Sequence, residues 1–366
     1  MNSELLALHA FATLPGIGAK SLAKIRTRGA EKLWRSGRLQ DFEQVMGAGK
    51  RAYAAYEQYT NLDREDYLKR EEEYLNTNGI RLIDASSSEF PQRLAQISVP
   101  PAMLYVKGRI PDLDHGLSVV GTRKFTGYGE RVCRSVVYDI ARYGVPIISG
   151  LALGIDSIAH KACLEAGTPT VAVLGGGLDD SVLYPKSNRE LVNRIIETGG
   201  AVVSEFHPKM QPRRETFPMR NRIVAGMSRG ILVIEAPRKS GTMITVERAL
   251  EENRDVFAIP GNIDQKTAEG TNYLIKQGAT VVTEAQDILD CFGLDATLKE
   301  ESVASFPPGQ QVVITALSTQ SMNLEQLASS TGQSVATLMT TLSLMELTGI
   351  VIVDGHGVYQ LRGKIT

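Results

Sequence analysis

Short apolar runs alternate with amphipathic stretches between residues 117 and 291. Runs rich in β-branched residues predict strands at Ser118–Gly121, Pro146–Ser149, Thr170–Leu174, Ala201–Ser204, Gly230–Glu235, Asp255–Ile259 and Thr280–Val282. Apolar residues at helical spacing predict helices at Glu130–Tyr143, Ile155–Ala166, Ser187–Glu197 and Met243–Asn253. This alternation is typical of parallel βαβ units with right-handed crossovers. We therefore expect an α/β fold, a doubly wound Rossmann-like parallel sheet.

A small helical module is predicted before this domain, over residues 1–75. Its segment Leu14–Gly18 has the pattern of a helix-hairpin-helix, in which a glycine turn presents backbone N–H groups to a phosphate. Val45–Lys50 is a weaker second copy. Residues 20–38 hold seven basic side chains and one acid, Glu31. A DNA contact and a packing role with a solvated basic face both fit this pattern.

The predicted domain of residues 76–292 starts with a lead-in that packs against the sheet and holds strands near Gly79–Ile83 and Met103–Val106. Residues 293–309 predict a linker, and residues 310–366 predict three helices followed by a β-hairpin, the winged-helix arrangement. The third of these helices, from Ser334, carries no lysine or arginine to contact phosphates or base edges. We expect it to serve protein interaction or packing.

Composition excludes several classes of protein. With 43% hydrophobic and 22% charged residues the chain is globular, and its net charge of −1 cannot coat duplex DNA. Nucleic-acid binding would have to come from local clusters. Three scattered cysteines and five dispersed histidines predict no metal site, and we expect a reducing cytoplasm. No apolar run approaches membrane-spanning length, and residues 1–14 lack a signal-peptide pattern.

Small or polar loops follow four of the predicted strands. They are Gly121-Thr122-Arg123, Ser149-Gly150-Leu151-Ala152, Gly175-Gly176-Gly177 and Ser240-Gly241-Thr242. Ligands on open parallel sheets bind at the carboxyl ends of the strands, so these loops should form one site. Arg123 stands where a dinucleotide fingerprint needs a glycine, and no acidic residue follows at a ribose-binding position. We therefore expect no nicotinamide cofactor.

A basic cluster precedes the strand Gly230–Glu235, and a helix N-terminus follows it at Ser240. The cluster consists of Lys209, Arg213, Arg214, Arg220 and Arg222. Arginines beside free N–H groups at a helix N-terminus favour an anion, here a phosphate or a nucleic acid. In the alternative, the cluster is a structural salt-bridge network in which Arg222 pairs with Glu235 or Asp156.

Several segments together resemble one family, the DNA-processing protein A family, DprA (also called Smf). They are Ser118–Arg123, Ser149–Asp156 with Ala159-His160, Tyr184–Asn188, Phe217–Gly226, Ser240–Thr245 and Val256–Gly261, in family order over roughly 170 residues. The flanking modules resemble the longer members of the family more loosely. Thr242-Met243 departs from the commoner Ser-Leu, and no family pattern accounts for the predicted linker.

The resemblance implies a cytoplasmic protein that binds single-stranded DNA, protects incoming strands and loads the recombinase RecA during natural transformation. It also implies a homodimer formed through the α/β domain, with single-strand-binding protein as a further partner, and no membrane. The residues that it implies for DNA binding are Arg123, Ser149, Gly150, Lys186, Arg214, Phe217, Arg220, Asn221, Arg222, Ser240, Gly241 and Thr242.

The residue types agree with this chemistry, because single-strand binding needs cations along the backbone and a flat ring for a base. Arg123 and its basic neighbours supply the first and Phe217 the second, unless Phe217 is a core aromatic. Asp156 and His160 lie on a predicted helix with no nucleophile at fixed spacing, so capping and packing suit them.

Two other classes of function are weaker. The core also resembles nucleoside-monophosphate phosphoribohydrolases, and Ser240-Gly241-Thr242 with Glu247 echoes their loop and catalytic glutamate. Their leading Pro-Gly-Gly is replaced here by Arg238-Lys239-Ser240, so we expect no enzyme. A protein-only adaptor would leave the arginines unexplained.

A dimer surface is predicted late in the α/β domain, between Asn272 and Cys291. This stretch holds more apolar residues than a sheet edge and a terminal helix should need, among them Ile275 and Leu289. An exposed surplus would suit a symmetric patch that pairs with its own copy. In the alternative, these residues are all core.

Overall fold

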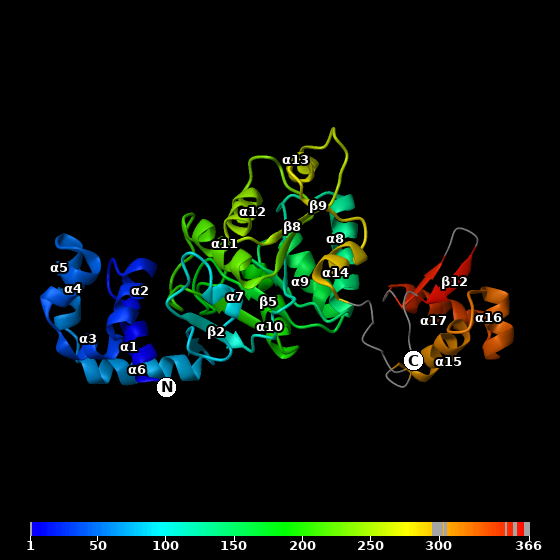
Figure 1. Cartoon of the computed structure of the whole chain (residues 1–366). Coiled ribbons are helices and arrows are strands. Elements are labelled where there is room, and N and C mark those ends of the chain that lie inside the picture. The colour runs from blue at the N-terminus through cyan, green and yellow to red at the C-terminus, as the bar shows by residue number, and fades with distance from the viewer. Residues whose placement is uncertain (1, 295–302, 304–305, 348–349, 354–356, 362–366) are drawn as a thin grey trace. The chain divides into compact units, whose positions relative to one another are not determined.

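A nine-stranded sheet forms the centre of the first of two units in the computed structural model. The structure describes residues 2–294, 303, 306–347, 350–353 and 357–361 (Figure 1). The strands are β1 (Arg81–Ile83), β2 (Leu104–Gly108), β3 (Leu117–Val120), β4 (Ile147–Ser149), β5 (Thr170–Val173), β6 (Ala201–Ser204), β7 (Gly230–Val233), β8 (Asp255–Ala258) and β9 (Thr280–Val281).

The chain reverses its direction of winding at β3. The strand order is β1-β2-β6-β5-β4-β3-β7-β8-β9, so β4, β5 and β6 extend the sheet to one side of β3 and β7 to β9 extend it to the other. All pairs from β6 to β9 are parallel. This confirms the doubly wound α/β prediction. The two lead-in strands do more than pack against the sheet, because β2 joins it by pairing antiparallel with β6.

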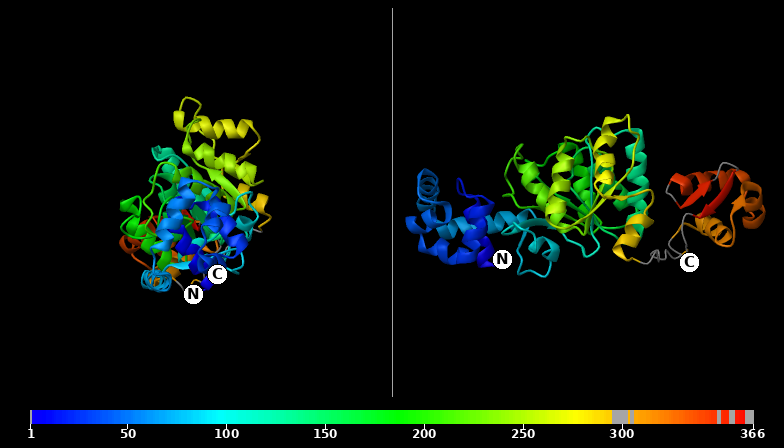
Figure 2. Two further views of the ribbon diagram at one scale, coloured as in Figure 1. Left: turned by 90° about the vertical axis from the view of Figure 1, so that its left-hand side faces the viewer. Right: turned by 45° about the horizontal axis from the view of Figure 1, so that its top comes forward.

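Helices cover both faces of this sheet (Figures 1 and 2). Successive strand residues point to opposite faces, and Ala172 and Val202 accordingly pack in one core while Val171, Val173 and Val203 pack in the other. The helices are α7 (Gln92–Ala95), α8 (Gly127–Arg142), α9 (Ile155–Glu165), α10 (Arg189–Glu197), α11 (Thr216–Met227), α12 (Gly241–Glu251), α13 (Glu269–Lys276) and α14 (Gln286–Phe292), with short 3₁₀ turns at Lys186–Asn188 and Lys266–Ala268.

The N-terminal helices belong to the same unit as the sheet. They are α1 (Ser3–Ala12), α2 (Ala19–Arg28), α3 (Ala30–Ser36), α4 (Leu39–Met46), α5 (Lys50–Thr60) and α6 (Arg64–Thr77). Gly16 and Gly47 take positive φ angles of 75° and 85° in the turns that lead to α2 and α5, as a glycine hairpin requires. Phe11 and Trp34 share one apolar core with Tyr105 and Leu191 of the sheet domain. The division after residue 75 therefore stays a prediction.

The second unit consists of residues from Gly293 onward together with Arg142–Gly144, and its elements are described by themselves. It contains α15 (Pro308–Leu317), β10 (Met322–Asn323), α16 (Leu324–Thr331), α17 (Val335–Leu347), β11 (Val351–Val353) and β12 (Val358–Leu361), with strand order β10-β12-β11. The three predicted helices and the hairpin strands are present, and the winged-helix assignment stays a prediction. Most of the predicted linker and two residues of the hairpin turn, Gly355 and His356, lie outside the described residues.

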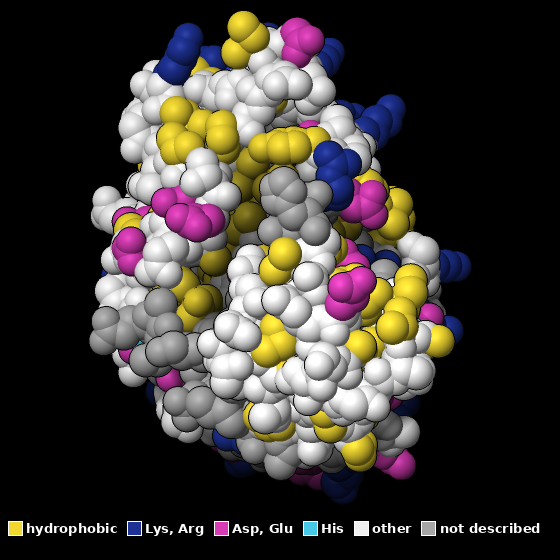
Figure 3. Space-filling model, turned by 90° about the vertical axis from the view of Figure 1, so that its right-hand side faces the viewer, with side chains coloured by type: hydrophobic (Ala, Val, Ile, Leu, Met, Phe, Trp, Pro, Cys, Tyr) yellow, Lys and Arg dark blue, Asp and Glu magenta, His cyan; other side chains and the backbone are white. Residues whose placement is uncertain are grey.

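Helix α17 exposes apolar rather than basic side chains, with Val335 48%, Met339 55% and Leu344 51% exposed. Figure 3 shows scattered hydrophobic side chains with a few acidic and basic ones between them. Within the described ranges, none of the helices combines the length and apolar character needed to cross a bilayer.

Candidate nucleic-acid interface

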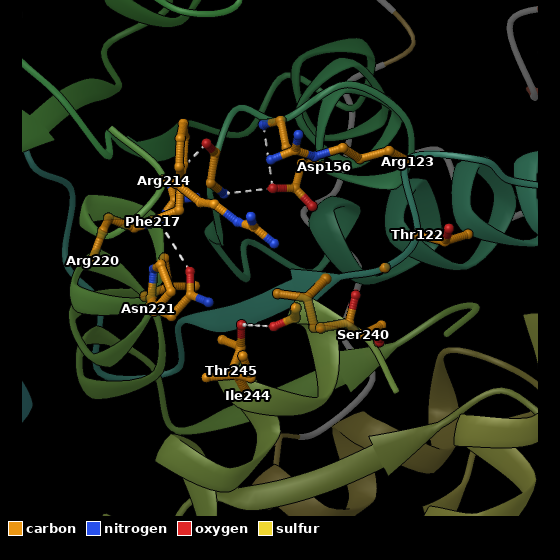
Figure 4. A pocket seen from close by; sticks show the side chains of 18 of the residues that line it. Thr122, Arg123, Asp156, Arg214, Phe217, Arg220, Asn221, Ser240, Ile244 and Thr245 are labelled. Carbon is orange, nitrogen blue, oxygen red and sulfur yellow. Dashed lines mark hydrogen bonds between the residues drawn. The ribbon is translucent and has the colours of Figure 1, made fainter. Parts of the chain in front are cut away.

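A cleft of about 710 Å³ opens at the carboxyl ends of the strands on either side of the switch at β3. This is the place where doubly wound sheets bind ligands. Its walls come from the loops after β3, β4 and β7 and from the first turns of α11 and α12 (Figure 4). The lining includes Gly121, Thr122, Arg123, Gly150, Arg213, Arg214, Phe217, Arg220, Asn221, Ser240, Gly241 and Thr242. Three of the four predicted loops therefore meet in one site.

Exposed arginines make one part of the cleft basic. Arg123, Arg213 and Arg214 are exposed and line it. The guanidinium carbon of Arg123 lies 5.7 Å from the centre of the Phe217 ring, within range of a cation–π contact. A phosphate and an aromatic base can therefore be held side by side in this part of the cleft.

The Phe217 ring is half-buried and rests on the third glycine loop. A side chain at Gly175 would place its Cβ 2.8 Å from the ring, so only glycine allows this approach. The Tyr184 ring meets Phe217 edge-on, with 6.0 Å between centroids, and is 48% exposed. Tyr184 lines the cleft and was missed by the sequence prediction. The sequence did offer a signal for it, because Tyr184 is an aromatic residue two positions before Lys186 in the family motif Tyr184–Asn188.

Arg220 lines the cleft but its guanidinium is bound by the protein. The residue is 5% exposed, and Nη1 donates to the carbonyl oxygens of Val173 and, at 2.7 Å, Gly150. Burial lowers the pKa of Arg220 to about 10, although the nearby Asp156 opposes this shift. Arg220 therefore bonds to the backbone at the carboxyl ends of β4 and β5. Among the predicted DNA-binding residues that line the cleft, Arg220 is the one least suited to contact a phosphate.

Asp156 and His160 of α9 hold the loop after β4 and the strand β5. The Asp156 carboxylate accepts the backbone N–H groups of Gly150 and Ala152 at 3.1 and 3.3 Å. Burial raises the pKa of Asp156, while Arg220 opposes the shift. His160 Nδ1 lies 2.8 Å from the Thr170 hydroxyl, and burial lowers the pKa of His160 to about 3. These contacts match the packing role expected for both, but neither side chain caps α9, because the N–H groups that Asp156 accepts precede the helix and His160 contacts Thr170 of β5.

The first turn of α12 faces the cleft with open backbone donors. Ser240 is the N-cap residue, yet its hydroxyl makes no capping bond and has no partner among the described residues. A Cβ at Gly241 would meet nothing within 4 Å. In Figure 4 this turn lies across the cleft from Arg214 and Phe217. The N–H groups and the helix dipole suit an anion there.

The structure takes three predicted residues out of this cleft. Arg222 pairs with Glu205 and donates to the carbonyl of Val99, and neither Glu235 nor Asp156 is its partner as the alternative had it. Ser149 is buried and donates to the carbonyl oxygen of Val119 at 2.6 Å. Lys186 is exposed but is not among the lining residues of this cleft.

The predicted dimer surface also changes. Leu289 has no exposed surface, so the core alternative holds for Leu289 and its placement on a dimer patch is wrong. Ile275 is half-buried on α13. Val281 of β9 is 40% exposed, and Ile263, which follows β8 and lies before the predicted stretch, is 95% exposed and was missed by sequence reasoning. A single isoleucine in the polar stretch Gly261–Gln265 gives no periodic signal.

Comparisons with known proteins place the chain in a family. The model of DNA recombination-mediator protein A matches residues 81–293. Protein Smf of Escherichia coli is 38% identical over 291 residues, covering 77% of each chain. The X-ray structure of DprA from Streptococcus pneumoniae has a TM-score of 0.66 at 33% identity and covers 79% of this chain and 98% of its own. DprA from Helicobacter pylori, solved for its single-stranded DNA binding mode, has a TM-score of 0.52 at 26% identity and covers 58% and 95%. The chain therefore belongs to the DNA recombination-mediator protein A family.

Proposed function

We propose that this protein binds single-stranded DNA in the cleft and acts as a recombination mediator in natural transformation. The observation that carries the proposal is the pairing of exposed arginines with a supported, half-exposed ring, Phe217, at the switch point of the sheet. Cationic grooves with a stacking ring bind single strands with little sequence preference. The single-stranded DNA binding mode of the Helicobacter pylori relative supports the same ligand.

Each wall of the cleft takes one part of a nucleotide in this proposal. Arg123, Arg213 and Arg214 contact phosphates, and the first turn of α12 at Ser240 accepts another. A base stacks on Phe217, with the Arg123 guanidinium on the same ring. Arg220 contributes positive potential at the wall of the cleft, without direct contact to the strand.

Arg123→Ala tests the phosphate contact. Loss of one phosphate contact should lower the slope of log affinity against log salt by roughly 0.7 for a single strand. We expect weaker oligo-dT binding with that shallower slope and an unchanged melting temperature, because Arg123 is exposed. Arg194→Ala, an exposed arginine on α10 away from the cleft lining, is the matched control. An unchanged slope for Arg123→Ala would remove this contact from the proposal.

We further propose that the protein is a homodimer that protects incoming strands and loads RecA onto them. Single-strand-binding protein competes with it for the same strands. This work takes place in the cytoplasm. The edge of the sheet at β9 supports a symmetric interface, because an unpaired edge strand is a template for a second copy. Val281 on this edge is 40% exposed and Ile263 is 95% exposed.

Ile263→Asp should therefore give a folded monomer that still binds oligo-dT. Ile275→Asp should have a smaller effect, because Ile275 is half-buried. We expect the Ile263→Asp monomer to fail in loading RecA on strands coated by single-strand-binding protein. Sedimentation reports the mass, and Leu250→Asp, which charges a 56% exposed leucine on α12, is the control. A monomer that loads RecA as well as the natural protein would separate dimerisation from loading.

The same cleft does not suit glycosidic hydrolysis, and we propose that the protein is not an enzyme. Glu247 is exposed on α12 and is not among the residues that line the cleft in the described ranges. The carboxylate that does line it, Asp156, is engaged by backbone N–H groups. We expect no free base from nucleoside monophosphates incubated with the purified protein. Release that Glu247→Ala abolishes would contradict this.

A further inference from the structure

One aromatic side chain in the wall of the cleft, that of Tyr184, is half exposed rather than packed in a core. Tyr184 is 48% exposed and lines the cleft, whereas its chain neighbours Leu183 and Pro185 are buried. It belongs to neither main core, and its hydroxyl has no hydrogen-bond partner within the described ranges. Such a ring is available to a ligand, because a tyrosine offers a large flat face at little cost in conformational entropy.

The segment that carries Tyr184 is fixed to another loop of the cleft. Asn188 is buried, and its side-chain nitrogen donates to the carbonyl oxygen of Leu151 at 2.9 Å and to the hydroxyl of Ser157 at 2.8 Å. Leu151 lies in the loop after β4, whose residues Gly150 and Ala152 line the cleft. The Tyr184 ring is therefore presented by an anchored backbone, and a preorganised ring binds a ligand at a lower entropic cost than a mobile one.

The rings of Tyr184 and Phe217 form two flat surfaces that face different directions. Their planes are inclined at 63° to each other, and their centroids lie 6.0 Å apart. Two bases that lie flat on these rings would be inclined by a similar angle. Neighbouring bases of a duplex strand are parallel and rise by about 3.4 Å per nucleotide. Two neighbouring bases can therefore occupy both rings only after they unstack from each other.

This requirement treats a single strand and a duplex differently. Unstacking a step inside a duplex disturbs base pairing and stacking on both strands, which costs free energy. An unpaired strand has no pairing to lose, and each of its bases gains an aromatic ring in exchange for its neighbour. The arginines of the cleft attract the phosphates of either form. The inclination of the two rings therefore supplies a selectivity that the cations do not.

We propose that Tyr184 is a second stacking platform, so that the cleft binds two neighbouring unpaired bases, one on Phe217 and one on Tyr184, and in this way selects single strands over duplexes. The inference rests on the proposed function and deepens it, because it assigns a binding residue and the number of bases held. Every base has a flat face, so the second position tolerates any sequence.

Strands that differ only in their bases test this proposal. The probes are oligonucleotides of abasic sugar-phosphates that carry either one thymine or two neighbouring thymines, so their charges are equal. We expect the natural protein to bind the two-thymine strand roughly tenfold tighter, the order of one base–aromatic stack. A strand whose two thymines are separated by several abasic positions should show no more than the statistical gain.

Two substitutions of Tyr184 separate the ring from the hydroxyl. Tyr184→Leu should abolish the gain from the second thymine and leave affinity for the one-thymine strand unchanged, because that base stacks on Phe217. Tyr184→Phe keeps the ring and should keep the gain. Tyr53→Leu, which alters a 60% exposed tyrosine on α5 outside the cleft lining, is the matched control. Circular dichroism should give equal melting temperatures, since Tyr184 lies outside both main cores.

The selectivity is measured with oligo-dT and with a duplex of equal length. Tyr184→Leu should lose roughly a factor of ten in affinity for oligo-dT and keep its affinity for the duplex, which does not use this ring. The ratio of the two affinities should fall by the same factor. A structural role for Tyr184 would lower both affinities together and would contradict the proposal.

The outcomes separate this inference from the proposed function. A natural protein that binds one-thymine and two-thymine strands equally, or a Tyr184→Leu variant that keeps the gain, would overturn the second platform and leave single-strand binding in the cleft intact. Loss of the gain in Tyr184→Phe would assign the effect to the hydroxyl and overturn stacking. If Arg123→Ala and Phe217→Leu also left oligo-dT binding unchanged, the proposed function would fail together with this inference. Should Tyr184→Leu melt at a lower temperature, the natural protein and Tyr184→Phe on the abasic strands still decide.

Discussion

Phe217→Leu should weaken oligo-dT binding by about 1–3 kcal/mol, a factor of roughly 5 to 150 in Kd, which is the usual cost of losing one base–aromatic stack. Leucine keeps most of the apolar volume but offers no flat face. The ring is held for stacking from behind by Gly175 and from the side by Tyr184. Its free face is therefore the one turned to the cleft.

The variant should stay folded, because Phe217 is half-buried and stands in the first turn of α11 rather than in either main core. Fluorescence anisotropy of labelled oligo-dT gives the affinity, and circular dichroism gives the melting temperature. Phe125→Leu, a 38% exposed phenylalanine that is not among the cleft-lining residues, is the matched control. A lower melting temperature with full affinity per folded molecule would make Phe217 a core residue, the alternative that the sequence left open.

The strands of the central sheet could be predicted because they are buried on both faces. Strand residues such as Val171, Val173, Val203 and Leu232 are all buried, so each strand reads as a continuous apolar run. The loops that follow the strands are short and consist of small residues. The place of the cleft then followed from the rule for parallel sheets. What could not be predicted was α11 (Thr216–Met227), since its first half reads as a basic loop and its buried face is defined by packing against α12, α7 and the strands β3 to β5.

The partners of individual charged residues could not be predicted from the sequence either. Sequence spacing indicates that Arg220 and Arg222 lie near the site, but not that one bonds two strand-end carbonyls and the other pairs with Glu205. Those partners are 17 to 70 residues away, and only the assembled fold brings them together. The apolar surplus late in the domain failed for the same reason. Leu289 fills a core that the sequence does not outline.

Arg220→Leu should cost the protein stability before it costs DNA affinity. Removing one partner of a buried charged pair typically destabilises by about 3–5 kcal/mol, because the other charge stays buried without compensation. Here the loss would leave Asp156 without its cation and the carbonyl oxygens of Gly150 and Val173 without a donor. Arg220→Lys should recover only part of the lost stability, since an ammonium cannot reproduce the planar fork of donors of a guanidinium.

The pH dependence of this variant distinguishes a structural from a DNA-contacting arginine. Burial raises the pKa of Asp156 and Arg220 opposes that shift, so the substitution raises the Asp156 pKa further. A carboxyl with a raised folded-state pKa contributes stability below its unfolded pKa and loses it as the pH rises through the folded value. The difference in melting temperature between the natural protein and Arg220→Leu should therefore shrink as the pH is lowered from about 7.5 toward the Asp156 pKa. A variant that melts like the natural protein at every pH, and fails only in binding oligo-dT with a shallower salt slope, would restore Arg220 to the phosphate-contacting set.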